Sequence, residues 1–349
     1  MDEEVTTSNS RSIRRTDRPA VNIIDVADLA GVSRQTVSNV VNDRGGFSEE
    51  TRSKVLRVIA ETGYKPNRAA RQLRTNRARH IGFPLHTGHF DPRNPFALLF
   101  LKAVAEAVKP LGHSLIVFAC GDDDEATFRS WASSGEVDGF VFDRVVPGDY
   151  RTRVLGELGV PFSVMGRTGE SEAQSWVDTD SRSGMMSLVD YLVGRGRRRF
   201  AFVDNGGSEP WVVDRVTAAA ERVAEHGLEL PPWAVLREGD YAVLSDQLDH
   251  VLRRADRPDA IIAGSDVLAL LAATRIREAG LTVGADVGVT GFDGGMQGWL
   301  VDETLTTVRI PATRVAEMLV ERLMGLLDGG PPPERGLILP TELVIGSSG

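Results

Sequence analysis

Apolar positions in residues 22–41 predict two short helices that meet at a glycine. Asn22, with Asp25 three positions later, forms the capping signature of the first helix. Gly31 ends that helix, and Ser33 is the natural N-cap of the second. The i, i+3, i+4 spacing predicts which residues face inward: Val26, Leu29 and Ala30 in the first helix, and Val37, Val40 and Val41 in the second.

A third helix is predicted between Ser48 and Gly63. Ser48 is its cap, and the acids Glu49 and Glu50 lie at the positive end of the helix dipole. Its inward residues are expected to be Val55, Leu56 and Ile59. Three short helices with these apolar faces predict a small all-α domain at the amino terminus.

The rest of the chain alternates short apolar runs with longer helical segments. The runs predict strands at 81–85, 114–119, 137–142, 161–165, 199–203, 233–236, 260–264 and 287–291. Helices are expected between them, for example at 181–194, 209–226 and 266–279. This alternation predicts an α/β body with two doubly wound parallel-sheet lobes, for which the chain is long enough.

Polar side chains occupy the outward face of the second helix. They are Arg34, Gln35, Thr36, Ser38 and Asn39, with Asn42 at its end. In a helix-turn-helix the second helix lies in the major groove, where Arg suits guanine and Gln or Asn suits adenine. We therefore predict a DNA-binding head, and an ordinary helical hairpin is the alternative.

The charge distribution favours DNA binding. The whole chain has a net charge of −9, but residues 1–80 hold fifteen Lys and Arg against ten Asp and Glu, and residues 81–349 hold 25 against 39. Residues 65–79 carry six bases and no acid. A basic segment beside a helix-turn-helix indicates phosphate contacts, whereas the acidic body would repel DNA.

The segments DVADLAGVSRQTVSNVVN, SEETRSKV and GYKPNRAARQLRTNRARHIGF resemble the head and hinge of the LacI/GalR family of bacterial repressors. The resemblance implies a hinge helix at 67–73 that folds on operator DNA. In it Asn67 and Arg68 would contact DNA, and Leu73 would be wedged between bases in the minor groove. The family usually has Arg where Asn39 stands, so an altered half-site is expected.

The resemblance also implies how the chain is divided. Residues 21–66 would be the helix-turn-helix domain, 67–79 the hinge helix and linker, and 80–349 the effector-binding and dimerisation domain. Residues 1–20 are expected to be a flexible tail, because residues 1–18 are polar and charged with no apolar run. The body is similar to type I periplasmic sugar-binding proteins, in which two interleaved lobes are joined by three crossings and enclose the ligand. LTTVRIPATRVAEM resembles the last crossing, with Ile310 where relatives carry glutamine.

Candidate ligand contacts follow from the strand ends and from the resemblance. Strand ends suggest Asp143, Arg167, Ser265, Asp266 and Asp293, the resemblance adds Arg215 and Tyr241, and Trp211 and Trp299 are candidates to stack on a second sugar ring. Carboxylates and guanidinium groups suit the hydroxyls of a sugar or short oligosaccharide. A helix cap, a surface ion pair or core packing is the alternative role for each residue alone.

Catalytic signatures are absent from the sequence. It contains no GxxxxGK[ST], no GxGxxG after a strand and no HExxH, so neither an enzyme nor a cofactor is expected. His86, His89 and Asp91 form only a weak metal candidate. A single cysteine, Cys120, and a polar amino terminus without a signal peptide predict a cytoplasmic protein, brought to the nucleoid by operator binding.

The expected partners are pseudo-palindromic operator DNA, a carbohydrate effector and a second copy of the chain, with no membrane. Residues 94–108 and 266–280 look like the first helices of the two lobes, which form much of the dimer contact in relatives. Lac-type relatives release DNA when ligand binds and purine-type relatives need a corepressor, and for a sugar we expect release. A sugar receptor without DNA activity and an enzyme acting on a small sugar or nucleotide are the rival classes.

Overall fold

The computed structural model describes residues 21–41, 45–64, 77–86, 94–121, 124–167, 175–296, 304–333 and 335–349. The chain divides into two compact units, Met1–Asn76 and Arg77–Gly349, which we call the head and the body. Each is described by itself. Within the described ranges, no helix is long and apolar enough to cross a membrane.

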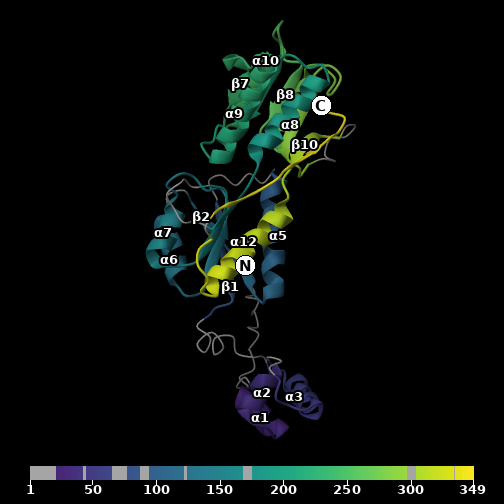
Figure 1. The fold of residues 1–349 in the computed structure, drawn as a ribbon. Helices are drawn as coiled ribbons and strands as arrows, with labels where there is room; N and C mark the ends of the chain where they lie inside the picture. The colour runs from purple at the N-terminus through teal and green to yellow at the C-terminus, as the bar shows by residue number, and fades with distance from the viewer. Residues whose placement is uncertain are drawn as a thin grey trace, which may run out of the picture. The chain divides into compact units, whose positions relative to one another are not determined.

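The head contains the three predicted helices, α1 (Ile23–Ala30), α2 (Arg34–Val41) and α3 (Glu49–Thr62) (Figure 1). The capping box of α1 is complete, because the Asn22 side chain accepts from Asp25 N and the Asp25 carboxylate accepts from Asn22 N at 2.8 Å. Gly31 closes α1 in the left-handed conformation, with φ 59°. The Ser33 hydroxyl accepts from Thr36 N at 3.0 Å, which confirms it as the cap of α2.

Small apolar side chains form the core of the head. It is built from Val26, Ala27, Ala30, Val37, Val40, Val55 and Val58, with Val41 and Ile59 packed against it. The inward prediction was wrong for Leu29 and Leu56, which are 63% and 45% exposed. The three short helices pack closely through alanine and valine side chains. The larger leucines at the edge of this contact face are left at the surface.

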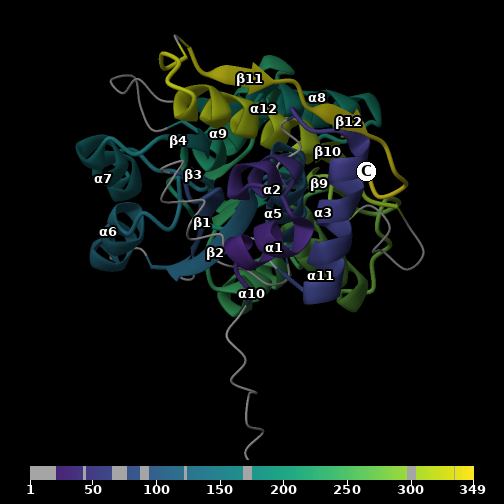
Figure 2. The same cartoon turned by 90° about the horizontal axis from the view of Figure 1, so that it is seen from below.

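The first lobe of the body is a parallel six-stranded sheet in the order β11-β5-β4-β3-β1-β2. Its strands are β1 (His80–His86), β2 (Ser114–Cys120), β3 (Gly139–Phe142), β4 (Phe162–Met165), β5 (Trp176–Thr179) and β11 (Leu337–Leu339). Its helices are α5 (Pro95–Val108), η1 (Lys109–Leu111), α6 (Glu125–Ser133), α7 (Tyr150–Leu158) and α12 (Ala312–Leu327). Helix α5 packs against α12 and α6 against α7, and the second pair lies side by side in Figures 1 and 2.

The second lobe has a six-stranded sheet in the order β12-β10-β9-β8-β6-β7, in which only β12 is antiparallel. Its strands are β6 (Phe200–Asp204), β7 (Val235–Arg237), β8 (Ala260–Ala263), β9 (Gly288–Asp293), β10 (Thr306–Arg309) and β12 (Glu342–Val344). Its helices are α8 (Ser181–Gly194), α9 (Pro210–Glu225), η2 (Pro232–Ala234), α10 (Tyr241–Leu252) and α11 (Asp266–Glu278). Strands β6, β8 and β9 are buried throughout, as expected for a sheet covered on both faces.

The chain crosses between the lobes three times, as predicted: from β5 to α8, from β10 to α12, and from β11 to β12. Two details of the prediction were wrong. The segment LTTVRIPATRVAEM forms the second crossing, since β11 and β12 follow it. Helix α11 is not the first helix of its lobe, because α8, α9 and α10 come earlier in the chain.

Candidate functional site

The outward face of α2 presents polar side chains to the surface of the head. Arg34 and Gln35 are exposed, and Ser38 and Asn39 are partly exposed. The Gln35 amide donates to the Asn39 side-chain oxygen at 2.8 Å, so these two predicted base readers are held together. The Thr36 hydroxyl is bonded to Ser33 Oγ at 2.9 Å and thus belongs to the helix cap. Asn42, Asn67, Arg68 and Leu73 lie outside the described residues.

The body contains a cavity of about 770 Å³ between the two lobes. Its first-lobe wall includes His86, Asn94, Arg144, Val146, Asp149, Tyr150 and Arg151, and its second-lobe wall includes Asp204, Asn205, Ser208, Glu209, Trp211, Arg215, Tyr241, Ser265, Leu268 and Asp293. Residues within two positions of the carboxyl ends of β3, β6 and β8 take part, which is where open α/β sheets bind ligands.

Arg215 is the most enclosed cation of the second-lobe wall. It comes from the second turn of α9, is only 4% exposed, and lies between aromatic rings, with its Cζ 3.6 Å from the Phe292 centroid and 4.6 Å from that of Trp211. Its Nη1 donates to the Gly264 carbonyl at 2.7 Å, and its Nη2 lies 3.3 Å from Asp293 Oδ1. Burial lowers the pKa of the Arg215 guanidinium, and the nearby carboxylates oppose that shift.

Asp293 ends β9 with a left-handed backbone, φ 106°. Burial raises the pKa of its carboxyl to about 6, although Arg215 favours the ionised form. Its side chain also hydrogen-bonds Asn94 of the first lobe. With Arg215 and Asn94 as its neighbours, the Asp293 side chain is a hydrogen-bonding group at the cavity wall, where its oxygens can accept further hydrogen bonds from a ligand.

Ser265 and Asp266 begin α11 beside Asp293. The Ser265 hydroxyl caps the helix at Leu268 N. Asp266 is buried and does not line the cavity; its carboxylate accepts from Thr307 Oγ1 at 2.5 Å and from Met296 N at 3.1 Å. Burial, with Asp293 nearby, raises the pKa of Asp266 to about 7. Asp266 thus fixes the chain that follows Asp293.

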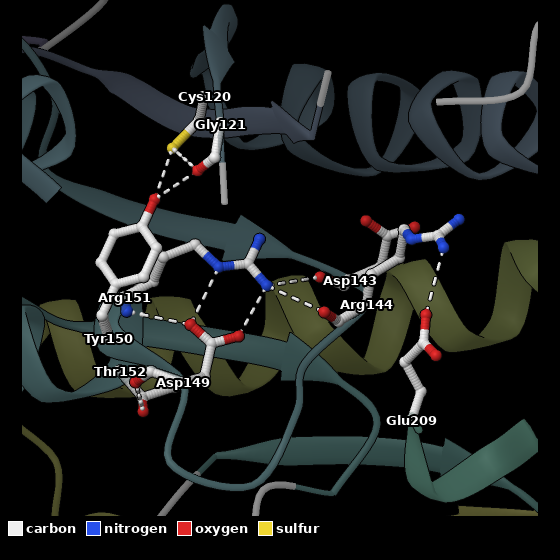
Figure 3. A network of polar contacts seen from close by, with 9 residues as sticks. All are labelled: Cys120, Gly121, Asp143, Arg144, Asp149, Tyr150, Arg151, Thr152 and Glu209. Carbon is white, nitrogen blue, oxygen red and sulfur yellow. Dashed lines mark hydrogen bonds and ion pairs between the residues drawn. The ribbon is translucent and has the colours of Figure 1, made fainter. Parts of the chain in front are cut away.

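Figure 3 shows the polar network of the first-lobe wall, centred on Arg151. This side chain is 1% exposed, and its Nε and Nη2 donate to the two Asp149 carboxylate oxygens at 3.0 and 2.7 Å. Nη2 also donates to the carbonyls of Asp143 and Arg144. The Tyr150 hydroxyl donates to the Gly121 carbonyl at 2.9 Å and lies 3.0 Å from Cys120 Sγ, where burial raises the pKa of the thiol.

The structure brings five of the nine predicted ligand contacts together at the cavity: Trp211, Arg215, Tyr241, Ser265 and Asp293. Asp143, Arg167 and Asp266 are not part of its wall. Arg167 instead pairs with Asp178 at 2.8 Å and with Asp214 of α9, and so links the two lobes. Trp299, and the metal candidates His89 and Asp91, lie outside the described residues.

Several wall residues were not predicted, and one of them had a usable signal. Asp204 ends strand β6 in the same way as Asp293 ends β9, so the strand-end rule applied to it equally. Asn94, Arg144, Asp149 and Glu209 follow or precede elements at positions that no local pattern distinguishes. Their roles depend on pairing across the fold, for example between Arg144 and Glu209 at 3.1 Å.

A helix-turn-helix head and a two-lobed body around a polar cavity together define a DNA-binding regulator of the ligand-receptor type. Residues 22–67 match the model of the lacI family of bacterial regulatory proteins, and residues 189–349 match that of the periplasmic binding protein-like domain. The HTH-type transcriptional regulator AglR of Rhizobium meliloti is 31% identical over 94% of both chains. The chain belongs to the LacI family of bacterial transcriptional regulators.

Other relatives match nearly the whole length of this chain. The HTH-type transcriptional regulator CelR of Thermobifida fusca is 29% identical over 97% of this chain and 100% of its own. A solved complex of the regulator CelR with cellobiose has a TM-score of 0.72 at 27% identity and covers 95% of this chain and 100% of that one. The Lac repressor dimer bound to operator and an anti-inducer has a TM-score of 0.78 at 25% identity, with 95% and 99% coverage.

Proposed function

We propose that the protein is a homodimeric transcriptional repressor, released from its operator when a sugar or short oligosaccharide binds between the lobes of the body. The observation that carries the proposal is one cavity in which Arg215, Ser265 and Asp293 lie beside Trp211 and Tyr241. Sugar hydroxyls both donate and accept hydrogen bonds, and the C–H faces of sugar rings suit aromatic side chains. A volume of about 770 Å³ is within the range of small-molecule sites.

The relatives support this proposal in two respects. The complex of CelR holds cellobiose, and the Lac repressor, 25% identical, has been solved with ONPG in its repressed state. The Lac repressor is also known as a dimer on operator DNA. A two-fold dimer matches a pseudo-palindromic operator, in which each head reads one half-site.

The proposed DNA contacts are those predicted from the sequence. On α2 they are Arg34, Gln35, Thr36, Ser38 and Asn39, joined by Asn42, and in the hinge they are Asn67, Arg68 and Leu73. The proposed domain boundaries lie after residues 20, 66 and 79. The proposed location is the cytoplasm, where operator binding would hold the protein on the nucleoid.

The proposed mechanism is a population shift. Hinge helices of the two subunits pair and fold on DNA only when the first lobes hold them at the right spacing, and ligand closure of the cavity changes that spacing. The ligand can weaken operator binding by no more than the difference between its affinities for the two lobe arrangements, the one that binds DNA and the one that does not.

A thermal-shift screen of the purified protein against sugars and purines tests the ligand class. Sugars are expected to raise the melting temperature of the wild type. The shift should be lost in Arg215→Ala and reduced in the milder Ser265→Ala, but kept in Arg222→Ala, whose side chain lies further along α9 and pairs with Asp190. If only purines raise the melting temperature, the proposed sugar effector is wrong and a purine corepressor takes its place.

A further inference from the structure

The carboxylates of the cavity wall share one property: each described one is paired with an arginine. The pairs are Asp149 with Arg151 at 2.7 Å, Asp204 with Arg237 at 2.9 Å, Glu209 with Arg144 at 3.1 Å and Asp293 with Arg215 at 3.3 Å. Three of these arginines line the cavity themselves, and Arg237 supports Asp204 from outside the wall. Each of the four described wall acids thus has an arginine partner, three of them in the wall and one outside it.

The pairing of the wall carboxylates with arginines affects which ligand charges the cavity accepts. All four carboxylates are buried, so their charges interact strongly with the paired arginines and weakly with water. An anionic ligand would lose its hydration on entry and would find each guanidinium already occupied by a carboxylate. A neutral ligand meets no such penalty.

The arginines nevertheless keep hydrogen-bond donors that the protein does not use. Among the described residues, Arg144 Nε, Arg151 Nη1 and Arg215 Nε are buried without an acceptor. These three nitrogens have almost no surface facing the cavity, so a ligand reaches them only if wall side chains shift. The guanidinium of Arg144 is the one that is partly exposed, and a neutral hydroxyl or ring oxygen can accept from it without changing the charge.

We propose that the effector is an uncharged sugar, that sugar phosphates and sugar acids are rejected, and that the Arg144–Glu209 pair sets this selectivity. The inference rests on the proposed function and narrows it. Arg144 follows β3 in the first lobe, and Glu209 precedes α9 in the second, so the pair spans the cavity from lobe to lobe. The Arg144 side chain is 26% exposed, the most of the three wall arginines.

Glu209 has a second effect, through α9. It occupies the N-cap position of α9 but makes no cap hydrogen bond with its side chain, which is turned to Arg144 instead. The amino end of a sixteen-residue helix attracts anions, here mainly through its dipole, because Pro210 has no N–H and Val212 N already donates to the Glu209 carbonyl. The Glu209 carboxylate therefore offsets both the Arg144 charge and the helix end, and its removal would leave two attractions for an anion at one point of the wall.

Isothermal titration calorimetry of the full chain tests the inference. The probes are cellobiose, maltose, trehalose and sucrose, each paired with its 6-phosphate. In the wild type we expect the neutral form to bind at least 30-fold more tightly than the phosphate. Glu209→Gln should shrink this ratio at least tenfold, and Arg144→Gln should widen it. Glu225→Gln, at the other end of α9 and paired with Arg222, should leave the ratio unchanged.

Each contrary result has a distinct meaning. Equal or tighter binding of the phosphate by the wild type overturns the inference alone, as does a folded Glu209→Gln protein with an unchanged ratio. If Glu209→Gln does not fold by circular dichroism, the wild-type ratio and Arg144→Gln decide the matter. Failure of every probe to bind overturns the proposed sugar effector and this inference with it.

Discussion

Arg215 and Asp293 form a buried ion pair, with Nη2 and Oδ1 3.3 Å apart, on the wall of the inter-lobe cavity. The pair joins α9 to the end of β9, and the guanidinium is also fixed by the Gly264 carbonyl and two aromatic rings. The same atoms would contact the ligand and stabilise the body, so one substitution in this pair is expected to change both ligand affinity and the free energy of unfolding.

Asp293→Asn should therefore both destabilise the body and weaken effector binding. Loss of the carboxylate leaves the buried Arg215 cation without the acid it pairs with, which costs about 3 kcal/mol of unfolding free energy. Urea denaturation followed by fluorescence measures this, with Asp256→Asn as the control because Asp256 pairs only with the surface residue Arg254. Equal stability of the two variants would show that the Arg215–Asp293 pair carries no stabilisation.

Asp266 predicts an unusual pH dependence. Its pKa of about 7 in the folded state lies above the ordinary Asp value, so the folded state binds the proton more tightly than the unfolded state. Stability is then lost as pH rises towards 7. Asp266→Asn removes this dependence, and its unfolding free energy should improve relative to the wild type by about 2 kcal/mol between pH 5 and pH 8. Urea titrations at both pH values measure the difference, and a constant gap contradicts the prediction.

The Arg151 network gives a matched comparison within α7. Arg151→Met removes the cation that pairs with the buried Asp149 carboxylate, which keeps only the backbone N–H of residue 151, and it removes the donor to the carbonyls of Asp143 and Arg144, at a cost of about 3–5 kcal/mol. Arg153→Met, two residues away, removes only exposed pairs with Glu125 and Glu157. Thermal unfolding should separate the two variants widely. Similar melting temperatures would mean that the network is not structural.

The structure also shows why sequence patterns predicted some elements and missed others. The caps of α1 and α2 depend on residues within three positions, such as Asn22 with Asp25, so local sequence contains the whole signal. Strands β5, β10, β11 and β12 are not among the strands that the apolar runs predicted. Their places in the sheets, and hence the order of the crossings, depend on long-range pairing.

The cavity shows the same division. The strand-end rule found Ser265 and Asp293, but at β3 it pointed to Asp143, whereas the next residue, Arg144, lines the wall with a left-handed backbone of φ 55°. A residue with a left-handed backbone changes the direction of the chain, and the sequence does not predict this conformation at an arginine. The pairing of Arg144 with Glu209 joins positions 65 residues apart and requires the fold itself.

The Gln35–Asn39 hydrogen bond bears on half-site preference. Asn39→Arg removes the acceptor of this bond and adds the guanine-reading side chain that the family usually has. Selection of randomised half-sites by the variant should enrich guanine at one symmetric position, at roughly 1–3 kcal/mol of discrimination. Arg57→Ala, on α3, is the control and should select the wild-type sequence. An unmoved preference in Asn39→Arg would exclude Asn39 as a base reader.

The central claim is that a sugar in the cavity controls operator binding, and fluorescence anisotropy with a labelled operator duplex tests it most directly. The protein is titrated at fixed salt with and without a saturating sugar from the calorimetric panel, since salt alone changes affinity. The account predicts that the sugar weakens operator binding of the wild type at least tenfold and leaves that of Arg215→Ala unchanged. Equal operator affinity of the wild type with and without a sugar that calorimetry shows to be bound would contradict it.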